Sequence, residues 1–483
     1  MATKIVTKNS STASAAPTAG DLVQGELAVN VTDKRLYTEN ASGAIVELGT
    51  NPLGAVTMAS TLGVTGVLTA TSLDISGDID VDGTTNLDIV DVDGAVNFAA
   101  DVTFADGADI ITASAGTSNF RAGVNAGNSI ESGGNYNTVV GDEAGTAITT
   151  GDENVAIGYA ALYSEDTATR ATAIGYGALY TQNAGDVAAY NTAVGYQAGL
   201  LVTTGTHNTL IGGLAGDAIT TGTYNVALGT SALSATTTAS YNSALGADSL
   251  VTNTTGAQNV AVGYNALNAN TTASNNTAVG SSALLVNTTG ADNTALGYAT
   301  LTANTTGTLN TASGSNALRY NTTGDNNTAL GRLALYNNTT ASNNTAVGYS
   351  ALGANTTGER LTAVGDSSLA TNTTGTDNTA IGLNTLYSNT TGSLNSAVGR
   401  NALYSNTTAS NNTAQGYYAL FANTTGADNV AVGKDALAAN TTASYNTAVG
   451  YNSLGANTTA ANNTALGYQS LYANTTGASN VAV

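Results

Sequence analysis

The sequence has no cysteine and no tryptophan, and only two of its 483 residues are proline. Without cysteine, neither a disulfide framework nor a thiol nucleophile is available. Charged residues are also scarce, at 9% of the chain, where soluble globular proteins usually carry roughly 25%. The 11 lysines and arginines face 32 aspartates and glutamates, for a formal net charge of -21. We therefore expect no nucleic-acid partner, because phosphate contacts need clustered Lys and Arg.

Long hydrophobic runs are lacking as well. No 18 consecutive residues are apolar, so we expect no membrane insertion. The first ten residues, Met1 to Ser10, lack the apolar segment of a secretory signal peptide. The chain is nevertheless 42% hydrophobic, mostly Ala, Val and Leu in a periodic pattern, which favours order over disorder.

A repeat of 17 residues dominates the chain. The phrase Asn-Thr-Ala-Val-Gly recurs in 20 copies between Gly141 and Gly467, and only the step from Gly175 to Gly195 has 20 residues. So short a copy cannot have its own core, so each one is expected to be a coil of a parallel β-solenoid or β-roll. The three extra residues predict a bulge near 185–190. Structural repeat glycines include Gly263, Gly280, Gly297, Gly348 and Gly450.

Each coil predicts two short strands. One is Thr-Ala-Val/Leu before the glycine, and the other is the Ala/Ser-Leu pair that ends four residues after it. The Ala and the neighbouring Val, Ile or Leu are expected to stack inside as apolar ladders. The Asn-Thr-Thr segment reads as a turn, with Asn and Gly in left-handed conformations. Its asparagines keep the 17-residue register and would form side-chain amide ladders. These turn asparagines include Asn253, Asn270, Asn287, Asn355 and Asn474.

Composition divides this all-β, elongated chain into three parts. Residues 1–53 predict an N-terminal β-meander module, residues 54–120 an acidic β-rich shaft, and residues 121–483 the solenoid of about 20 coils. The expected strands of the meander are residues 25–30, 35–39 and 44–49.

One candidate metal site lies in the shaft. Asp78, Asp80 and Asp82 match the first half of a calcium-binding loop, but Ile89 stands where the bidentate glutamate belongs. Because apolar residues alternate with these aspartates, a solvated acidic strand face is the favoured interpretation. A cation held between chains is the alternative. We expect no resident metal or other cofactor.

No catalytic constellation is visible. The single histidine, His207, lies at a turn between repeats, without a nucleophile or carboxylate placed to work with it. Asp and Glu hold no fixed place in the repeats, which argues against paired glycan-cleaving carboxylates there. We therefore expect a protein that is not an enzyme.

Tyrosines recur after the glycine, as at Tyr159, Tyr176 and Tyr196, and after the leucine, as at Tyr163 and Tyr180. Stacked aromatic side chains along a rod are the simplest interpretation, and a carbohydrate-binding stripe is the alternative. The Asn-Thr-Thr triplets match a glycosylation sequon but are read as turn chemistry. A threonine ladder also leaves an ice-binding surface open.

The stretch Leu22–Gly49, with Gly-Glu-Leu-Ala-Val-Asn and Arg-Leu-Tyr-Thr-Glu, resembles N-terminal modules of tail fibres from tailed bacteriophages, particularly marine ones. Residues 54–120 resemble the shafts of such fibres. The repeats resemble heads of trimeric autotransporter adhesins and, more closely, repeats of other phage tail fibres. The resemblance implies a homotrimer that is made in the host cytoplasm and carried on the virion.

In that family the N-terminal region lies toward the virion, so residues 1–53 would bind phage tail or virion proteins. A host surface receptor or glycan would be bound at a distal end, which we expect beyond Val483. The predicted function is thus a tail fibre or similar appendage that mediates adsorption. Three alternatives stay open: a bacterial trimeric surface adhesin, a glycan-degrading tailspike and an ice-binding β-solenoid.

Overall fold

The computed structural model describes residues 7–12, 15–24, 26–32, 35–47 and 115–483. Within these residues the chain is all-β and contains no helix. Two compact units, Met1–Thr103 and Phe104–Val483, divide it. The predicted shaft lies outside the described residues except for 115–120, and so do Asp78, Asp80 and Asp82.

The first unit contains a four-stranded sheet in the order β1-β2-β3-β4. Its strands are β1 (Thr7–Ser10), β2 (Leu27–Asn30), β3 (Arg35–Glu39) and β4 (Ile45–Glu47). Strands β2, β3 and β4 pair antiparallel as a meander. Strand β1, which the sequence analysis did not foresee, adds a parallel edge beside β2. Leu22, Ala28 and Tyr37 form the small core.

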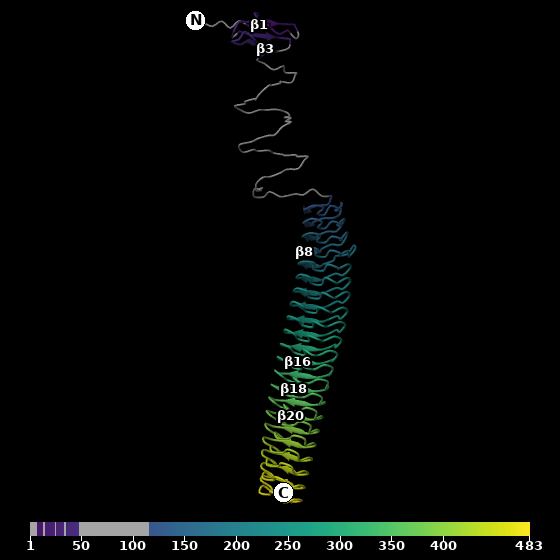
Figure 1. Ribbon diagram of the computed structural model, residues 1–483, viewed down its shortest axis with the longest axis vertical. Coiled ribbons are helices and arrows are strands. Elements are labelled where there is room, and N and C mark those ends of the chain that lie inside the picture. Colours follow the sequence, from purple (N-terminus) through teal and green to yellow (C-terminus); the bar gives the residue numbers. More distant parts are fainter. Residues whose placement is uncertain (1–6, 13–14, 25, 33–34, 48–114) are drawn as a thin grey trace, which may run out of the picture. The chain divides into compact units, whose positions relative to one another are not determined.

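The second unit is a single-chain parallel β-solenoid of about 21 turns with 17-residue repeats, which appears as a gently curved rod (Figure 1). Each coil contributes one short strand, paired in parallel with the strand of the next coil. The strands are β5 (Phe120–Ala122), β6 (Thr138–Val140), β7 (Val155–Ile157), β8 (Thr172–Ile174), β9 (Thr192–Val194), β10 (Thr209–Ile211), β11 (Val226–Leu228), β12 (Ser243–Leu245), β13 (Val260–Val262), β14 (Thr277–Val279), β15 (Thr294–Leu296), β16 (Thr311–Ser313), β17 (Thr328–Leu330), β18 (Thr345–Val347), β19 (Thr362–Val364), β20 (Thr379–Ile381), β21 (Ser396–Val398), β22 (Thr413–Gln415), β23 (Val430–Val432), β24 (Thr447–Val449), β25 (Thr464–Leu466) and β26 (Val481–Ala482).

The solenoid begins one coil earlier than the repeat pattern indicated. Strand β5 pairs with β6 at a step of 18 residues, Phe120 opposite Thr138. Gly123 lies against Gly141 as the later repeat glycines lie against one another. The sequence hid this coil because Phe-Arg-Ala-Gly replaces the usual phrase and its step is one residue too long.

The orientation predicted for the aliphatic residues is wrong. In β14 and β15 the central alanines, Ala278 and Ala295, are fully buried and stand opposite each other. Val279 and Leu296, which end these strands, point outward and are 37% and 39% exposed. Successive side chains of a strand face opposite ways, so a buried central residue forces its neighbours out. The narrow coil admits alanine there, and the aliphatic row lies on the surface.

The second predicted strand of each coil is also wrong. We count positions in a coil from its repeat glycine, so that Ala283 and Leu284 occupy positions 3 and 4 after Gly280. Ala283 N–H donates to the carbonyl of Gly280, which closes a turn rather than a strand. Leu284 is buried with a φ of +52°, in the left-handed region. The Asn-Thr-Thr asparagines have no such angle; position 2, position 4 and position 12 carry it with the repeat glycine.

The three extra residues form a surface loop, as the break in the period predicted. Strands β8 and β9 keep the regular register, with Thr172 opposite Thr192. An isolated parallel bridge joins Thr169 to Ala188 just after the loop. At Gly185, with a φ of +71°, an added Cβ would meet open space. The insertion is therefore absorbed outside the stacked core.

Candidate functional site

The repeat glycines hold the closest approach between coils. Gly280 has a φ of +136°, a conformation that L side chains rarely adopt. An added Cβ would lie 2.4 Å from the carbonyl oxygen of Gly297 in the next coil. The same arrangement recurs at Gly263, Gly348 and Gly450. These positions therefore have a structural role in coil stacking.

The Asn-Thr-Thr asparagines lie inside the solenoid at position 7. Asn270 Nδ2 donates to Asn253 Oδ1 over 2.9 Å and to the carbonyl of Ala273 over 3.0 Å. Asn287 repeats both contacts one coil on, at 3.0 and 2.9 Å. The row runs on through Asn355 to Asn474. Buried at this position, these sequons cannot accept a glycan without unfolding.

A second buried amide row at position 13 was not recognised in the sequence. Asn276 N–H donates to Asn259 Oδ1 over 3.0 Å, and its Nδ2 donates to the carbonyl of Gly290 over 3.0 Å. Ala171 and Leu361 interrupt this row. The signal was available, since the first residue of Asn-Thr-Ala-Val-Gly recurs every 17 residues. Each coil is thus fixed to the next by two side-chain amides.

One fully buried carboxylate, also missed in the sequence, replaces the position 7 asparagine near the start of the solenoid. Glu165 accepts bonds from Gln182 Nε2 at 2.9 Å and from the backbone N–H groups of Ala168 and Asp166 at 2.9 and 3.1 Å. Gln182 Oε1 in turn accepts from Asn191 Nδ2 at 2.8 Å. Each donor in this chain is neutral.

His207 lies on the surface in a column of aromatic rings at position 12. Its ring centroid is 5.1 Å from that of Tyr190 and 4.5 Å from that of Tyr224. Nδ1 lies 3.0 Å from the hydroxyl oxygen of Thr206. Across the described ranges, no three His, Cys, Asp or Glu side chains gather as a metal site would require.

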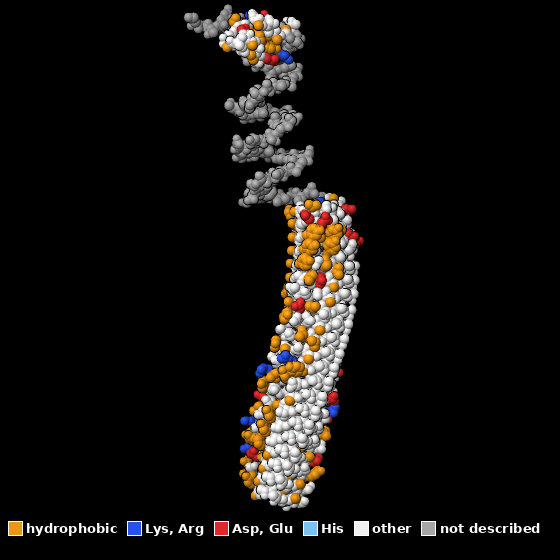
Figure 2. Space-filling view, in the orientation of Figure 1, with side chains coloured by type: hydrophobic (Ala, Val, Ile, Leu, Met, Phe, Trp, Pro, Cys, Tyr) orange, Lys and Arg blue, Asp and Glu red, His pale blue; other side chains and the backbone are white. Residues whose placement is uncertain are grey.

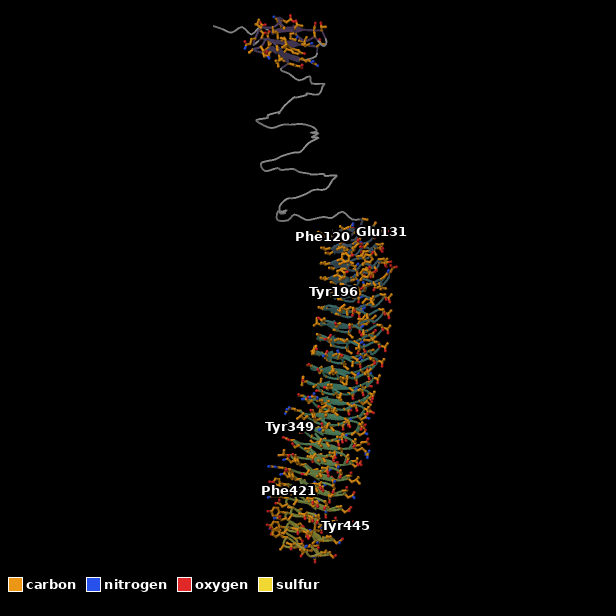
Figure 3. The ribbon with its side chains drawn as sticks, in the orientation of Figure 1. Phe120, Glu131, Tyr196, Tyr349, Phe421 and Tyr445 are labelled. Carbon is orange, nitrogen blue, oxygen red and sulfur yellow. The ribbon has the colours of Figure 1, made fainter. Side chains whose placement is uncertain are left out.

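Two stacked tyrosine columns run along the first coils of the solenoid. At position 1, the rings of Tyr159 and Tyr176 have centroids 5.2 Å apart, and those of Tyr176 and Tyr196 are 5.4 Å apart. At position 5, Tyr163 and Tyr180 are 4.9 Å apart and tilted by only 3°. Figure 2 shows the hydrophobic surface that gathers at this end of the solenoid, and Figure 3 labels Tyr196 within it.

A groove of about 600 Å³ lies along these columns. Position 2 supplies its small residues, Ala160 and Gly177. The same position places Glu143 one coil before them and Gln197 one coil after them, so these polar groups mark its two ends. No lysine or arginine lines the groove. We call it the tyrosine groove.

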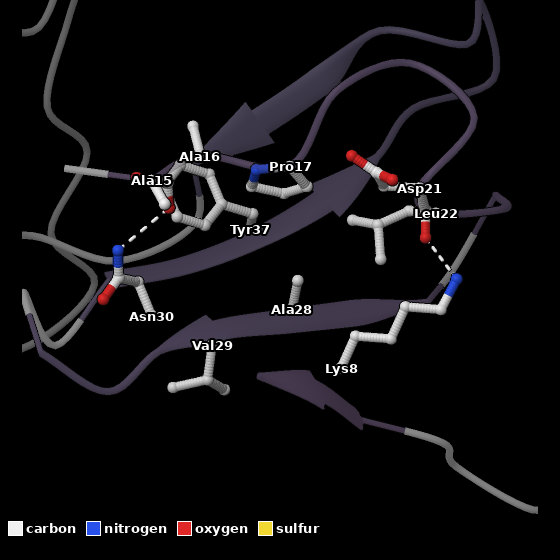
Figure 4. A pocket seen from close by; sticks show the side chains of 10 residues that line it. All are labelled: Lys8, Ala15, Ala16, Pro17, Asp21, Leu22, Ala28, Val29, Asn30 and Tyr37. Carbon is white, nitrogen blue, oxygen red and sulfur yellow. Dashed lines mark hydrogen bonds between the residues drawn. The ribbon is translucent and has the colours of Figure 1, made fainter. Parts of the chain in front are cut away.

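A smaller pocket of about 310 Å³ lies in the N-terminal sheet (Figure 4). Tyr37 and Leu22 line it, and Lys8 donates to the carbonyl of Asp21 beside it. Asn30 Nδ2 closes the other side with a 2.9 Å bond to the carbonyl of Ala15. Its polar groups are thus engaged in holding the loop over the sheet.

No protein-family model, curated protein or solved structure matches this chain. No helix long and apolar enough to cross a bilayer occurs in the described residues. The likeness to phage tail fibres thus stays a prediction made from the residues.

Proposed function

We propose that this chain is a structural virion protein, a tail fibre or similar appendage, in which the solenoid is a rigid spacer. Residues 1–53 would bind phage tail or virion proteins, and a distal end would bind a host surface receptor or glycan. The resemblance of Leu22–Gly49 and of the repeats supports this proposal. So does the solenoid itself, because two continuous amide rows and the stacked glycines suit a part that must keep its length under load.

We propose further that the appendage is a homotrimer packed along the outer face of the solenoid sheet. The outward aliphatic row carries this proposal. From Val140 to Leu466, 18 of the 20 residues that precede a repeat glycine are Val, Ile or Leu, and Ser313 and Gln415 are the two exceptions. The other outward row of the sheet, at position 14, holds only Thr, Ser and Val.

The size of this face fits an assembly interface. At about 4.8 Å per coil the 20 coils span roughly 100 Å, and two outward residues cover about 7 Å of width. The resulting area of roughly 700 Å² is close to the ~800 Å² that each partner buries in a stable complex. A continuous exposed apolar strip of this size usually marks an interaction surface.

Light scattering combined with sedimentation velocity tests the proposal, and we expect an elongated trimer. Lysine at three successive positions of the row, Val262, Val279 and Leu296, should give a folded monomer, since charges would be desolvated between copies. The matched control places lysine at Thr272, Thr289 and Thr306, which lie outside the sheet, and should stay trimeric. A wild-type monomer would exclude the trimer.

The threonine rows argue against the ice-binding alternative. At position 8 the hydroxyl is already used, as in Thr288 Oγ1, which donates to the carbonyl of Thr305 over 3.0 Å. Only the row at position 9, which includes Thr289, is exposed and regular. A single row offers no two-dimensional array of hydroxyls. Measured thermal hysteresis would reverse this judgement.

A further inference from the structure

We propose that the tyrosine groove binds a short neutral oligosaccharide along the side of the solenoid. From Glu143 to Gln197 the groove spans three coil steps, or roughly 14 Å. That length suits a few linked sugar rings. This inference does not depend on the proposed function, because it concerns only side chains within one solenoid.

The arrangement of the rings determines what the walls offer. Because neighbouring tyrosines stack at about 5 Å, most ring faces are covered, and the ring edges and phenolic hydroxyls remain free for a ligand. One face stays open, on the side of Tyr196 toward the next coil. Position 1 of that coil is Gly213, where an added Cβ would meet nothing within 4 Å. A sugar ring can stack there.

Charge selects the class of ligand. Glu143 at one end and the absence of Lys and Arg from the lining disfavour phosphates, sulfates and acidic sugars. Ring edges carry the positive end of the aromatic quadrupole, so they also disfavour a cation such as a quaternary ammonium. A neutral ligand with apolar C–H faces and many hydroxyls matches both the edges and the polar ends.

The groove exists only where the sequence departs from the rest of the solenoid. The coils that begin at Gly158 and Gly175 are the only two consecutive coils with tyrosine at both position 1 and position 5. They also carry the small residues Ala160 and Gly177 at position 2, where Gln, Asn, Leu, Asp or Ser is common elsewhere. A Cβ at Gly177 would contact only Leu200 Cδ1 and Gln197 Cγ, at 3.6 and 3.7 Å.

Position 2 allows the groove to be filled without disturbing the coil. Gly177 has a φ of +61°, and Gln197 and Gln469 hold glutamine at the same position with φ of +52° and +51°. Gly177→Gln is therefore compatible with the backbone and fills the groove. Ser231→Gln makes the same change at position 2 outside the groove and is the matched control.

Calorimetric titration of the full chain with maltotriose, cellotriose, mannotriose and the N-acetylglucosamine trimer tests the proposal. At about 10 mM ligand, even a Kd near 1 mM gives near-saturation. We expect at least one trisaccharide to bind, at least tenfold weaker binding to Gly177→Gln and to Tyr176→Ala, and unchanged binding to Ser231→Gln.

Three results would overturn it: no binding of any of the four sugars, equal binding by Gly177→Gln and wild type, or selective binding of tetramethylammonium or sulfated oligosaccharide in their place. Circular dichroism of each variant separates loss of the site from loss of the fold. The oligomeric state, measured on the same samples, keeps this test distinct from that of the trimer.

Discussion

Gly280 lies so close to Gly297 that a Cβ on the first would be 2.4 Å from the carbonyl oxygen of the second. The coils are therefore in backbone contact at this corner, and no side chain can separate them. The requirement is doubled by the φ of +136°, which only glycine adopts freely. The glycine is needed for stacking and for conformation alike.

Gly280→Ala should lower the stability of the solenoid by at least about 2 kcal/mol, because the clash adds to the backbone strain. The measurement is guanidinium unfolding followed by circular dichroism. Gly213→Ala is the control, since an added Cβ there meets nothing within 4 Å and its φ is not left-handed. Equal effects of the two substitutions would show that coil contact is not the cause.

Asn287→Asp should destabilise by about 3 kcal/mol, because a buried carboxylate replaces an amide that donates to Asn270 Oδ1 and to the carbonyl of Gly290. Thermal unfolding at neutral pH provides the measurement. Asn326→Asp makes the same change at exposed position 12 and should be nearly silent. A silent Asn287→Asp would mean that the amide row contributes little to stability.

Glu165→Gln should destabilise by roughly 1–3 kcal/mol although it removes a buried charge. The donated bonds run from Asn191 to Gln182 to Glu165, and a glutamine at the end would place a donor against a donor. Unfolding of the variant is compared with that of Glu153→Gln, which alters only an exposed ion pair with Arg170. A stabilised Glu165→Gln would show that charge burial outweighs these bonds.

Asp217→Asn should raise Tm by about 1–3 °C at pH 7. Burial raises the pKa of Asp217 above its ordinary value of 3.8, and Oδ1 is buried without a hydrogen-bond partner. A carboxyl whose pKa is higher when folded contributes stability below 3.8 and loses it as the pH rises through the folded value. The gain of the variant should therefore vanish as the pH falls toward 3.8.

Melting curves between pH 3 and 8 check this prediction. The control Asp428→Asn changes an exposed carboxylate and should give the same pH profile as the wild type. A gain in Tm that persists at acidic pH would show that it arises from something other than titration of Asp217.

The repeat made the solenoid predictable, whereas the orientation of its side chains was not. Thr-Ala-Val in β14 alternates equally well with the alanine inside or with Thr277 and Val279 inside, and hydropathy favoured the wrong choice. The width of the coil decides, and it is a tertiary property. The left-handed Leu284 was likewise hidden, because leucine rarely adopts a positive φ.

The site was only partly visible in the sequence. The spacing of Tyr159, Tyr176 and Tyr163 predicted stacked rings, which the structure places at 4.9–5.4 Å. The groove could not be foreseen, because it depends on which rows lie side by side around the coil. The importance of Gly177 follows only from the neighbours that an added Cβ would meet.

Each strand of the solenoid pairs only with the strands of the coils directly before and after it, as β14 pairs only with β13 and β15. Duplication or deletion of one 17-residue segment would therefore change the reach of the rod by about 4.8 Å and leave the environment of the other coils unaltered. Reach becomes a quantity that a gene can adjust in equal increments, like the graduations of a ruler. The strand order, the core and the surface chemistry of every other coil would be inherited unchanged.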